Sequence, residues 1–182
     1  NTIIYSKRSA MPNKVGSRYF DLYQYNLLTE KETRLTKDLR AFSPVFSKID
    51  SSIYYLSTFD GTQNIYKINL SSNSSEKISS FSNHEIINNL TFDPLNNRLL
   101  FDKTTNHNKS IYFLSLSDST KGTYIDAALW DARNADVLDG GIIYSEDRTG
   151  IFNLYYIDGK KQGYISNTTG GAFMPDLSLV HI

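Results

Sequence analysis

The residues that could carry chemistry are few and widely spaced in this chain of 182 residues. Ser74 and Lys77 match the Ser-x-x-Lys spacing of acyl-transfer enzymes, in which a desolvated lysine activates the serine. This pair lies in a Ser-rich segment typical of a hairpin tip, where the lysine would stay solvated. The histidines His84, His107 and His181 fall in separate segments and lack the spacing of a metal site. We therefore expect no catalytic residue, no metal site and no cofactor.

Carboxylates recur beside turn residues instead of forming one pair. Glycoside hydrolysis needs two different carboxylates held about 5 to 10 Å apart. Asp50, Asp60 and Asp147 instead stand near Gly or Asn at similar points of the chain, which is typical of side-chain hydrogen bonds within turns. The sequence therefore predicts a structural role for these carboxylates.

Composition limits the classes of partner. The 19 basic and 19 acidic side chains cancel, so we expect no nucleic-acid partner. The apolar runs are shorter than the roughly 20 residues of a spanning helix, so no membrane insertion is expected. The absence of cysteine is compatible with the cytoplasm or with an exported bacterial protein. Because the chain begins Asn1-Thr2-Ile3 without a leader, we expect a processed or excised part of a longer protein, with any signal peptide outside this chain.

A short aromatic segment recurs four times, ending each time on a polar turn. Its anchors Tyr23, Tyr66, Tyr112 and Tyr155 are separated by 43, 46 and 43 residues, which is the period of a β-propeller blade. Between anchors the pattern predicts four short strands per repeat. We expect one propeller region over 1–182, with repeats near 1–42, 43–88, 89–134 and 135–172, and with 173–182 starting or closing a blade.

Within each repeat, apolar runs and turn residues predict the strands. Expected first strands lie at 44–47 and near 135–137, and the segment 173–178 resembles another. Expected second strands lie at 2–6, 52–57, 98–102 and 141–145. Expected third strands lie at 21–26, 64–69, 110–115 and 153–158, and expected fourth strands near 33–36, 76–79, 123–125 and 163–166.

Several segments resemble a known repeat. Pro44-Val45-Phe46-Ser47, Thr58 to Tyr66 with Asp60-Gly61 and Asn64-Ile65-Tyr66, and Arg34-Leu35-Thr36 together are similar to the TolB-like or PD40-type (WD40-like) propeller repeat. Its Ser-Pro-Asp-Gly turn is missing at Ser47 to Asp50, and Trp130-Asp131 does not stand where WD40 repeats place that pair. The resemblance covers nearly the whole chain and implies an all-β propeller.

Two ring sizes remain open at this point. We expect about four four-stranded antiparallel blades that form an incomplete part of a six- to eight-bladed ring, because the family usually has more than four blades. The alternative is a closed four-bladed ring, in which 173–178 would pair beside 2–6 and remove the sheet edges. In an incomplete ring, the open blade faces could pair with a second copy of the chain.

The expected binding face holds the loops between second and third strands and the connections between blades. These segments are 9–18, 37–43, 80–89, 126–133 and 168–172. Aromatic and arginine side chains dominate interface energy, so the candidate contacts on this face are Lys14, Arg18, Arg40, His84, Trp130 and Arg133. The structural alternative is that Trp130 packs between blades and that the cations are solvated.

Two functions are consistent with these residues. The first is a noncatalytic module that binds a protein or peptide, as the resemblance to TolB-like bacterial envelope proteins implies, with a periplasmic or extracellular location. The second is the propeller portion of a larger hydrolase, such as a prolyl-oligopeptidase-like or tricorn-like peptidase. A nucleophile elbow in sequence outside this chain would identify the second.

Overall fold

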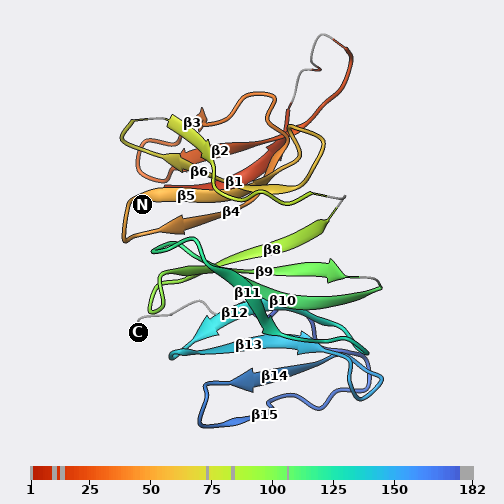
Figure 1. The fold of residues 1–182 in the computed structure, drawn as a ribbon. Coiled ribbons are helices and arrows are strands. Elements are labelled where there is room, and N and C mark those ends of the chain that lie inside the picture. The colour runs from red at the N-terminus through yellow and green to blue at the C-terminus, as the bar shows by residue number, and fades with distance from the viewer. Residues whose placement is uncertain are drawn as a thin grey trace. The chain divides into compact units, whose positions relative to one another are not determined.

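A computed structural model describes residues 2–9, 12, 15–72, 74–82, 85–105 and 107–176, which form fifteen β-strands and no helix (Figure 1). The strands whose register is defined pair antiparallel. These residues confirm the all-β prediction. They accordingly contain no helix that could span a membrane.

The strands form four sheets, each built from consecutive strands. The first sheet holds β1 (Thr2–Arg8), β2 (Phe20–Asn26) and β3 (Lys31–Arg34). The second holds β4 (Ala41–Ser47), β5 (Ser52–Ser57), β6 (Asn64–Asn69) and β7 (Ser74–Lys77). The third holds β8 (Ile86–Asp93), β9 (Arg98–Thr105), β10 (Asn108–Ser115) and β11 (Lys121–Ile125). The fourth holds β12 (Ala132–Leu138), β13 (Gly141–Glu146), β14 (Asn153–Ile157) and β15 (Gln162–Tyr164).

The first strands of the blades depart from the prediction. β4, β8 and β12 begin inside the segments 37–43, 80–89 and 126–133, which were expected to be connections. Each of these strands contains a residue with positive φ, at Ser43, Asn89 and Asn134. At Ser43 and Asn134 the pairing with the next strand also shifts register. Such a bulge interrupts the alternation of apolar residues, which is why the sequence pattern hid the first half of these strands.

The aromatic anchors form one cross-strand ring pair in every sheet. Each anchor tyrosine lies opposite an aromatic residue of the preceding strand, with ring centroids 5.6 to 6.2 Å apart. The pairs are Tyr5 with Tyr23, Tyr55 with Tyr66, Phe101 with Tyr112 and Tyr144 with Tyr155. Such pairs add to strand pairing beyond the area they bury. The recurrence confirms the repeat read from the tyrosine spacing.

A polar side chain two residues before each anchor holds the chain that leaves the blade. Asn64 Oδ1 accepts hydrogen bonds from Ser79 Oγ at 2.8 Å and from the Phe81 amide at 2.7 Å. Asn153 Oδ1 accepts from Ser166 Oγ at 3.0 Å and from the Thr168 amide at 2.9 Å. The equivalent residues are Asp21, which accepts from Thr36 Oγ1 and the Leu39 amide, and Ser110, which accepts from the Ala127 amide. We call these four sets of contacts the exit clips.

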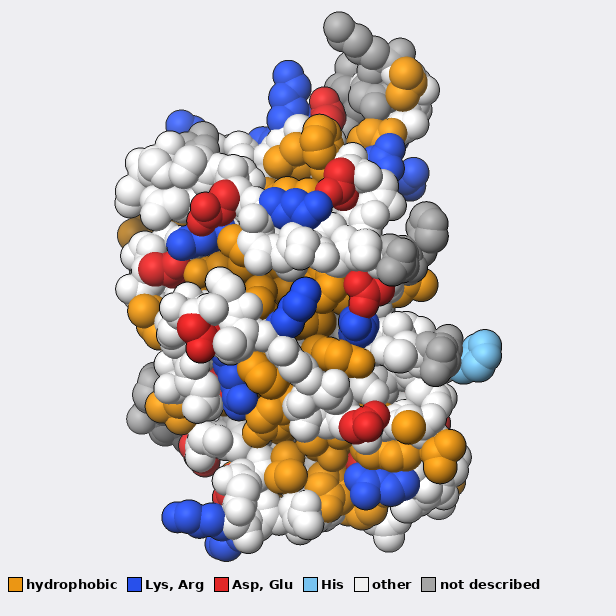
Figure 2. All heavy atoms as spheres, viewed as in Figure 1, with side chains coloured by type: hydrophobic (Ala, Val, Ile, Leu, Met, Phe, Trp, Pro, Cys, Tyr) orange, Lys and Arg blue, Asp and Glu red, His pale blue; other side chains and the backbone are white. Residues whose placement is uncertain are grey.

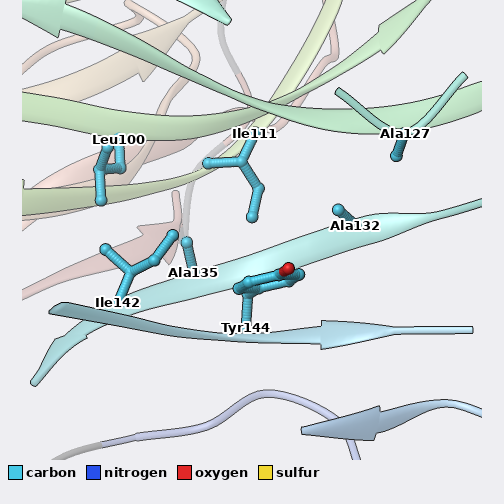
Figure 3. Close-up of a cluster of buried hydrophobic side chains, with 7 residues drawn as sticks. All are labelled: Leu100, Ile111, Ala127, Ala132, Ala135, Ile142 and Tyr144. Carbon is cyan, nitrogen blue, oxygen red and sulfur yellow. The ribbon is translucent and has the colours of Figure 1, made fainter. Parts of the chain in front are cut away.

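The chain divides into two compact units, Asn1–Ile86 and Ile87–Ile182, and each contains a core between two sheets. In the first unit, Leu22 of the first sheet packs with Ile53 and Tyr55 of the second. In the second unit, Leu100 and Ile111 of the third sheet point toward Ile142 and Tyr144 of the fourth (Figure 3). Since each thin sheet uses its neighbour for cover, the packing has the character of stacked repeats. The expectation of one region with four stated repeats stays a prediction.

The observations at the two ends of the described chain agree with an incomplete ring. β1 is an edge strand that pairs with β2 alone in its sheet. Phe173 to Asp176 form no strand, and residues 177–182 lie outside the described part. Ala172 instead donates a backbone hydrogen bond to Phe152 O at 2.8 Å, and the Phe173 ring lies tilted against the Phe152 ring with centroids 4.9 Å apart. The described residues therefore contain no strand pairing that closes a four-bladed ring.

Candidate functional site

The candidate contact residues fall into the two units. Lys14 and His84 lie outside the described residues. Arg18 is exposed, and its neighbour Tyr19 is stacked by Arg40, whose guanidinium carbon lies 4.4 Å from the ring centre. Arg40 also donates to the Tyr19 hydroxyl at 3.1 Å. Arg40 therefore contacts Tyr19, the residue that follows Arg18 in the chain.

The β9–β10 turn, the connection to the fourth sheet and the β13–β14 loop meet at one edge of the second unit. The amide of Asp131, in the connection to the fourth sheet, donates to Asp147 Oδ1 in the β13–β14 loop at 2.7 Å. The amide of Lys109, just after the β9–β10 turn, donates to Asp131 Oδ1 at 2.9 Å. Both loops are therefore fixed to the same connection. We call this edge the loop edge of the second unit.

An arginine that the sequence analysis did not single out lies at the centre of the loop edge. Arg148 has its guanidinium carbon 4.3 Å from the Trp130 ring centre and 5.3 Å from that of Tyr155. It donates to Glu146 Oε2 at 2.5 Å. The side chain of Glu146 is fully buried, whereas that of Arg148 is 47% exposed. We call Trp130, Glu146, Arg148, Tyr155 and Tyr164 the Arg148 cluster.

Tyr164 completes this cluster from β15. Its hydroxyl donates to Glu146 Oε1 at 2.5 Å, and its ring meets that of Tyr155 edge-on at 5.1 Å. Burial, followed by this hydrogen bond to Glu146, raises the pKa of Tyr164 to about 12. Both oxygens of the buried Glu146 carboxylate are therefore hydrogen-bonded, one by the neutral Tyr164 hydroxyl and one by the Arg148 cation.

On the face of the molecule drawn in Figure 2, basic side chains lie directly among hydrophobic ones.

Trp130 has a structural contact as well as a place in this cluster. It is half-buried and packs against the core cluster of the second unit. This position agrees with the structural alternative, in which Trp130 packs between blades. Its neighbour Leu129 is 92% exposed. A role for Trp130 in contacting a partner stays a prediction.

Arg133 lies in a second aromatic group of the same unit. Its guanidinium carbon is 3.8 Å from the Phe152 ring centre and 5.5 Å from that of Phe173. Its Nε is buried and makes no hydrogen bond within the described structure. In the register of β12 and β13, Arg133 lies opposite Ser145, whereas Ala132 lies opposite Glu146. Alternate residues of a strand point to opposite faces, so Arg133 leaves β12 on the face opposite to Ala132.

A buried carboxyl lies between the positive-φ residues of β8 and β12 in the second unit. Asp102 is 1% exposed and accepts from Asn89 Nδ2 at 2.9 Å and from the Asn134 amide at 3.0 and 3.1 Å. Burial raises the pKa of Asp102 to about 7, against the hydrogen bonds that lower it. The two asparagines are the residues with positive φ in β8 and β12. Asp102 therefore joins the first strands of two blades.

The other candidates for chemistry lie apart and have structural partners. Lys77 Nζ donates to Asp60 Oδ2 at 2.5 Å, and this bond raises the pKa of Lys77, which opposes a role as base for Ser74. Asp60 Oδ1 also accepts from the Thr62 amide at 3.2 Å, which confirms the turn role. His107 is exposed. Within the described ranges, no group of three or more His, Cys, Asp or Glu residues could hold a metal ion.

Comparisons with known proteins give the fold but no family assignment from sequence. No protein-family profile and no curated protein sequence matches the chain. Among solved structures, TolB from Acinetobacter baumannii is similar, with TM-score 0.76, 21% identity and coverage of 93% of this chain and 42% of TolB. The chain thus spans less than half the length of that protein.

Two proteins from Pyrococcus species are each similar over 92% of the chain. The β-propeller domain of the Trilobed protease from Pyrococcus furiosus has TM-score 0.66 and 13% identity, with coverage of 92% of this chain and 52% of that domain. The acylaminoacyl peptidase from Pyrococcus horikoshii has TM-score 0.62 and 12% identity, with coverage of 92% and 31%. The successive antiparallel sheets, the core between the two sheets of each unit and these similarities together show that the chain has the fold of a TolB-like β-propeller.

Proposed function

We propose that this propeller is a noncatalytic module that binds a protein or peptide at the loop edge of the second unit. The observation that supports this role most is the combination of half-exposed Arg148, half-buried Trp130 and exposed Leu129 at that edge. Tryptophan and arginine are the residues that most often dominate binding energy at interfaces. The hydrogen bonds of Asp131 hold this edge rigid, which lowers the entropy cost of binding.

Selection of peptides from a random library against the immobilised chain tests this role. Leu129→Ser should weaken binding of the selected peptides at least about fivefold, since one apolar hot-spot contact is worth more than about 1 kcal/mol. Leu95→Ser is the matched control, because Leu95 is 71% exposed and lies in the turn between β8 and β9, at the other end of the strands. Equal weakening by both substitutions would contradict binding at the loop edge.

The propeller portion of a larger hydrolase is the second proposal. Its support is the similarity to the acylaminoacyl peptidase, of which the chain covers 31%. A Gly-x-Ser-x-Gly elbow in the gene beyond either end of this chain, with peptide hydrolysis by the full product, would favour it. A gene product without such an elbow that binds peptides without cleaving them would favour the binding module.

The periplasmic or extracellular location and pairing with a second copy also remain proposals. Ile3 of β1 is 48% exposed, whereas Ile53 at the same position of β5 is buried against the first sheet. The face of the first sheet that carries Ile3 is therefore exposed, whereas the equivalent face of the second sheet is covered. Light scattering that compares the molar mass of Ile3→Lys with that of the unchanged chain tests whether this face forms dimers.

Fractionation of cells that express the whole gene tests the periplasmic or extracellular location.

A further inference from the structure

We propose that the Arg148 cluster is a guanidinium-binding site, and that an arginine side chain of a peptide partner takes the place Arg148 fills in the free protein. This inference rests on the proposed peptide-binding role and names the chemistry of the peptide.

The buried carboxylate requires a cation at this place. Glu146 has 0% exposure, with Oε2 bonded to Arg148 and Oε1 to the Tyr164 hydroxyl. An ionised carboxylate without a counter-charge is strongly disfavoured inside a protein. The cation beside Glu146 can therefore be exchanged but not simply removed.

The rings select a flat cation. The guanidinium of Arg148 lies over Trp130 at 4.3 Å and near Tyr155 at 5.3 Å. A planar, weakly hydrated guanidinium stacks on aromatic faces better than a compact ammonium does. The cluster is thus expected to prefer arginine over lysine.

Arg148 can leave without disturbing the sheet. It lies in a turn closed by a hydrogen bond from the Gly150 amide to Asp147 O at 2.7 Å, and Asp147 is held separately by Asp131. Rotation of a side chain that is already 47% exposed would return its charge to water. Exchange of one guanidinium for another is then nearly neutral in energy, and contacts of the peptide with exposed Leu129 would decide the balance.

Charge at the loop edge favours a basic ligand. Residues 107–109, 126–133 and 146–150, which form this edge, contain four acidic and three basic side chains, a balance of −1 with His107 neutral. The acidic residues are Asp126, Asp131, Glu146 and Asp147. Such an excess attracts cations and repels a carboxylate ligand.

Other repeats also place a cation near the anchor tyrosine, but only the fourth has an acid at the position of Glu146. Lys7 lies 5.2 Å from the Tyr23 ring centre, and Lys103 lies 4.5 Å from that of Tyr112. The position that Glu146 occupies, two residues after the ring partner of the anchor, is Lys7, Ser57 or Lys103 in the other repeats. The buried acid is therefore an addition to the common pattern.

The single tryptophan of the chain gives a direct readout, because Trp130 is itself part of the cluster. Arg148→Ala is titrated with N-acetyl-arginine amide at constant ionic strength while its fluorescence is followed. We expect a saturable change with a Kd at least about tenfold lower than in the unchanged chain, where Arg148 competes, and lower than for N-acetyl-lysine amide. The double variant Arg148→Ala with Glu146→Gln should lose this response.

A folded Arg148→Ala variant without a saturable response would overturn the proposal, and so would an equal response when Glu146 is also replaced. If Arg148→Ala does not fold, the unchanged chain is titrated with N-acetyl-arginine amide while the NMR signal of the Trp130 indole N–H is followed. A shift of this signal would support the site, and an unchanged signal would overturn it. Library peptides that bind the loop edge without any preference for arginine would also overturn it, while leaving the proposed function intact. A saturable response in Arg148→Ala, with no library peptide bound by the unchanged chain, would support the site and sink the proposed function.

Discussion

Asn64 Oδ1 accepts a hydrogen bond from Ser79 Oγ at 2.8 Å, and this pair recurs in the fourth sheet as Asn153 and Ser166 at 3.0 Å. Ser79 Oγ in turn accepts from the Ile65 amide at 2.8 Å, so the hydroxyl links the start of β6 to the end of the blade. Asn64 is fully buried, so its polar atoms are shielded from bulk solvent. The exit clip therefore fixes where the chain leaves one sheet for the next.

Asn64→Ala is expected to lower the free energy of unfolding by about 2 to 3 kcal/mol, because it leaves the buried Phe81 amide without its acceptor. Asn69→Ala is the matched control, since Asn69 caps the exposed Ser71 and Ser72 amides at the other end of β6. It should cost less than about 1 kcal/mol. Urea unfolding measures both, and equal costs would show that the clip carries no special stability.

Asp102 is expected to make stability fall as pH rises. Its pKa is about 7 in the folded chain and near 3.8 when exposed. Below pH 3.8 Asp102 is protonated in both the folded and the unfolded chain, so its titration does not lower the free energy of unfolding. Between these values only the unfolded state loses its proton, so stability falls, and above pH 7 the penalty is complete, at most about 4 kcal/mol.

Asp102→Asn removes this titration while keeping an acceptor for the Asn134 amide. Its unfolding free energy relative to the unchanged chain should therefore rise by about 2 to 3 kcal/mol between pH 5 and pH 8. Chemical unfolding at a series of pH values measures the difference, in which groups common to both chains cancel. A difference that does not vary with pH would mean that Asp102 is not desolvated as described.

Gly141 leaves no room for a side chain at the start of β13. A Cβ there would lie 2.5 Å from Ile157 O and 2.8 Å from Asp158 Cβ. Gly141→Ala should cost about 1 to 3 kcal/mol, because the backbone of β14 has to move. Gly163→Ala in the same sheet is the control, since nothing lies within 4 Å of its Cβ position, and its thermal midpoint should stay unchanged or rise slightly.

Two leucines of the second unit separate the roles of core and surface. Leu100 is fully buried in the core cluster, and Leu100→Ala should cost about 2 to 5 kcal/mol. Leu129 is 92% exposed, and Leu129→Ala should change stability by less than about 0.5 kcal/mol. Denaturant midpoints test both. A large cost at Leu129 would mean that this residue is structural and not available to a partner.

The period of the anchor tyrosines was sufficient to predict the sheets, because each tyrosine forms the same ring pair with the preceding strand. β5 and β6 have the predicted bounds. The first strands were harder, since the bulges at Ser43 and Asn134 break the alternation on which strand prediction depends. Local pattern fails where the backbone departs from a regular ladder.

The candidate site was predictable only in outline. The sequence indicated the loop edge and Trp130, but not Arg148, which reads as part of a charged turn. Its significance depends on the burial of Glu146, and that burial requires Tyr164 from a strand 18 residues further along the chain. One signal was present: an acid at the position that the other repeats fill with Lys7, Ser57 or Lys103.

Every exit clip closes on the chain just beyond its own blade. Whole repeats can therefore be added or removed without breaking the clips of the repeats that remain. Duplication or loss of a segment as long as one period would leave each remaining exit clip with the donors and acceptors it already has. The clips therefore set no limit on the number of repeats, whereas contacts between blades, such as that of Asp102 with Asn134, would have to form anew at a changed junction.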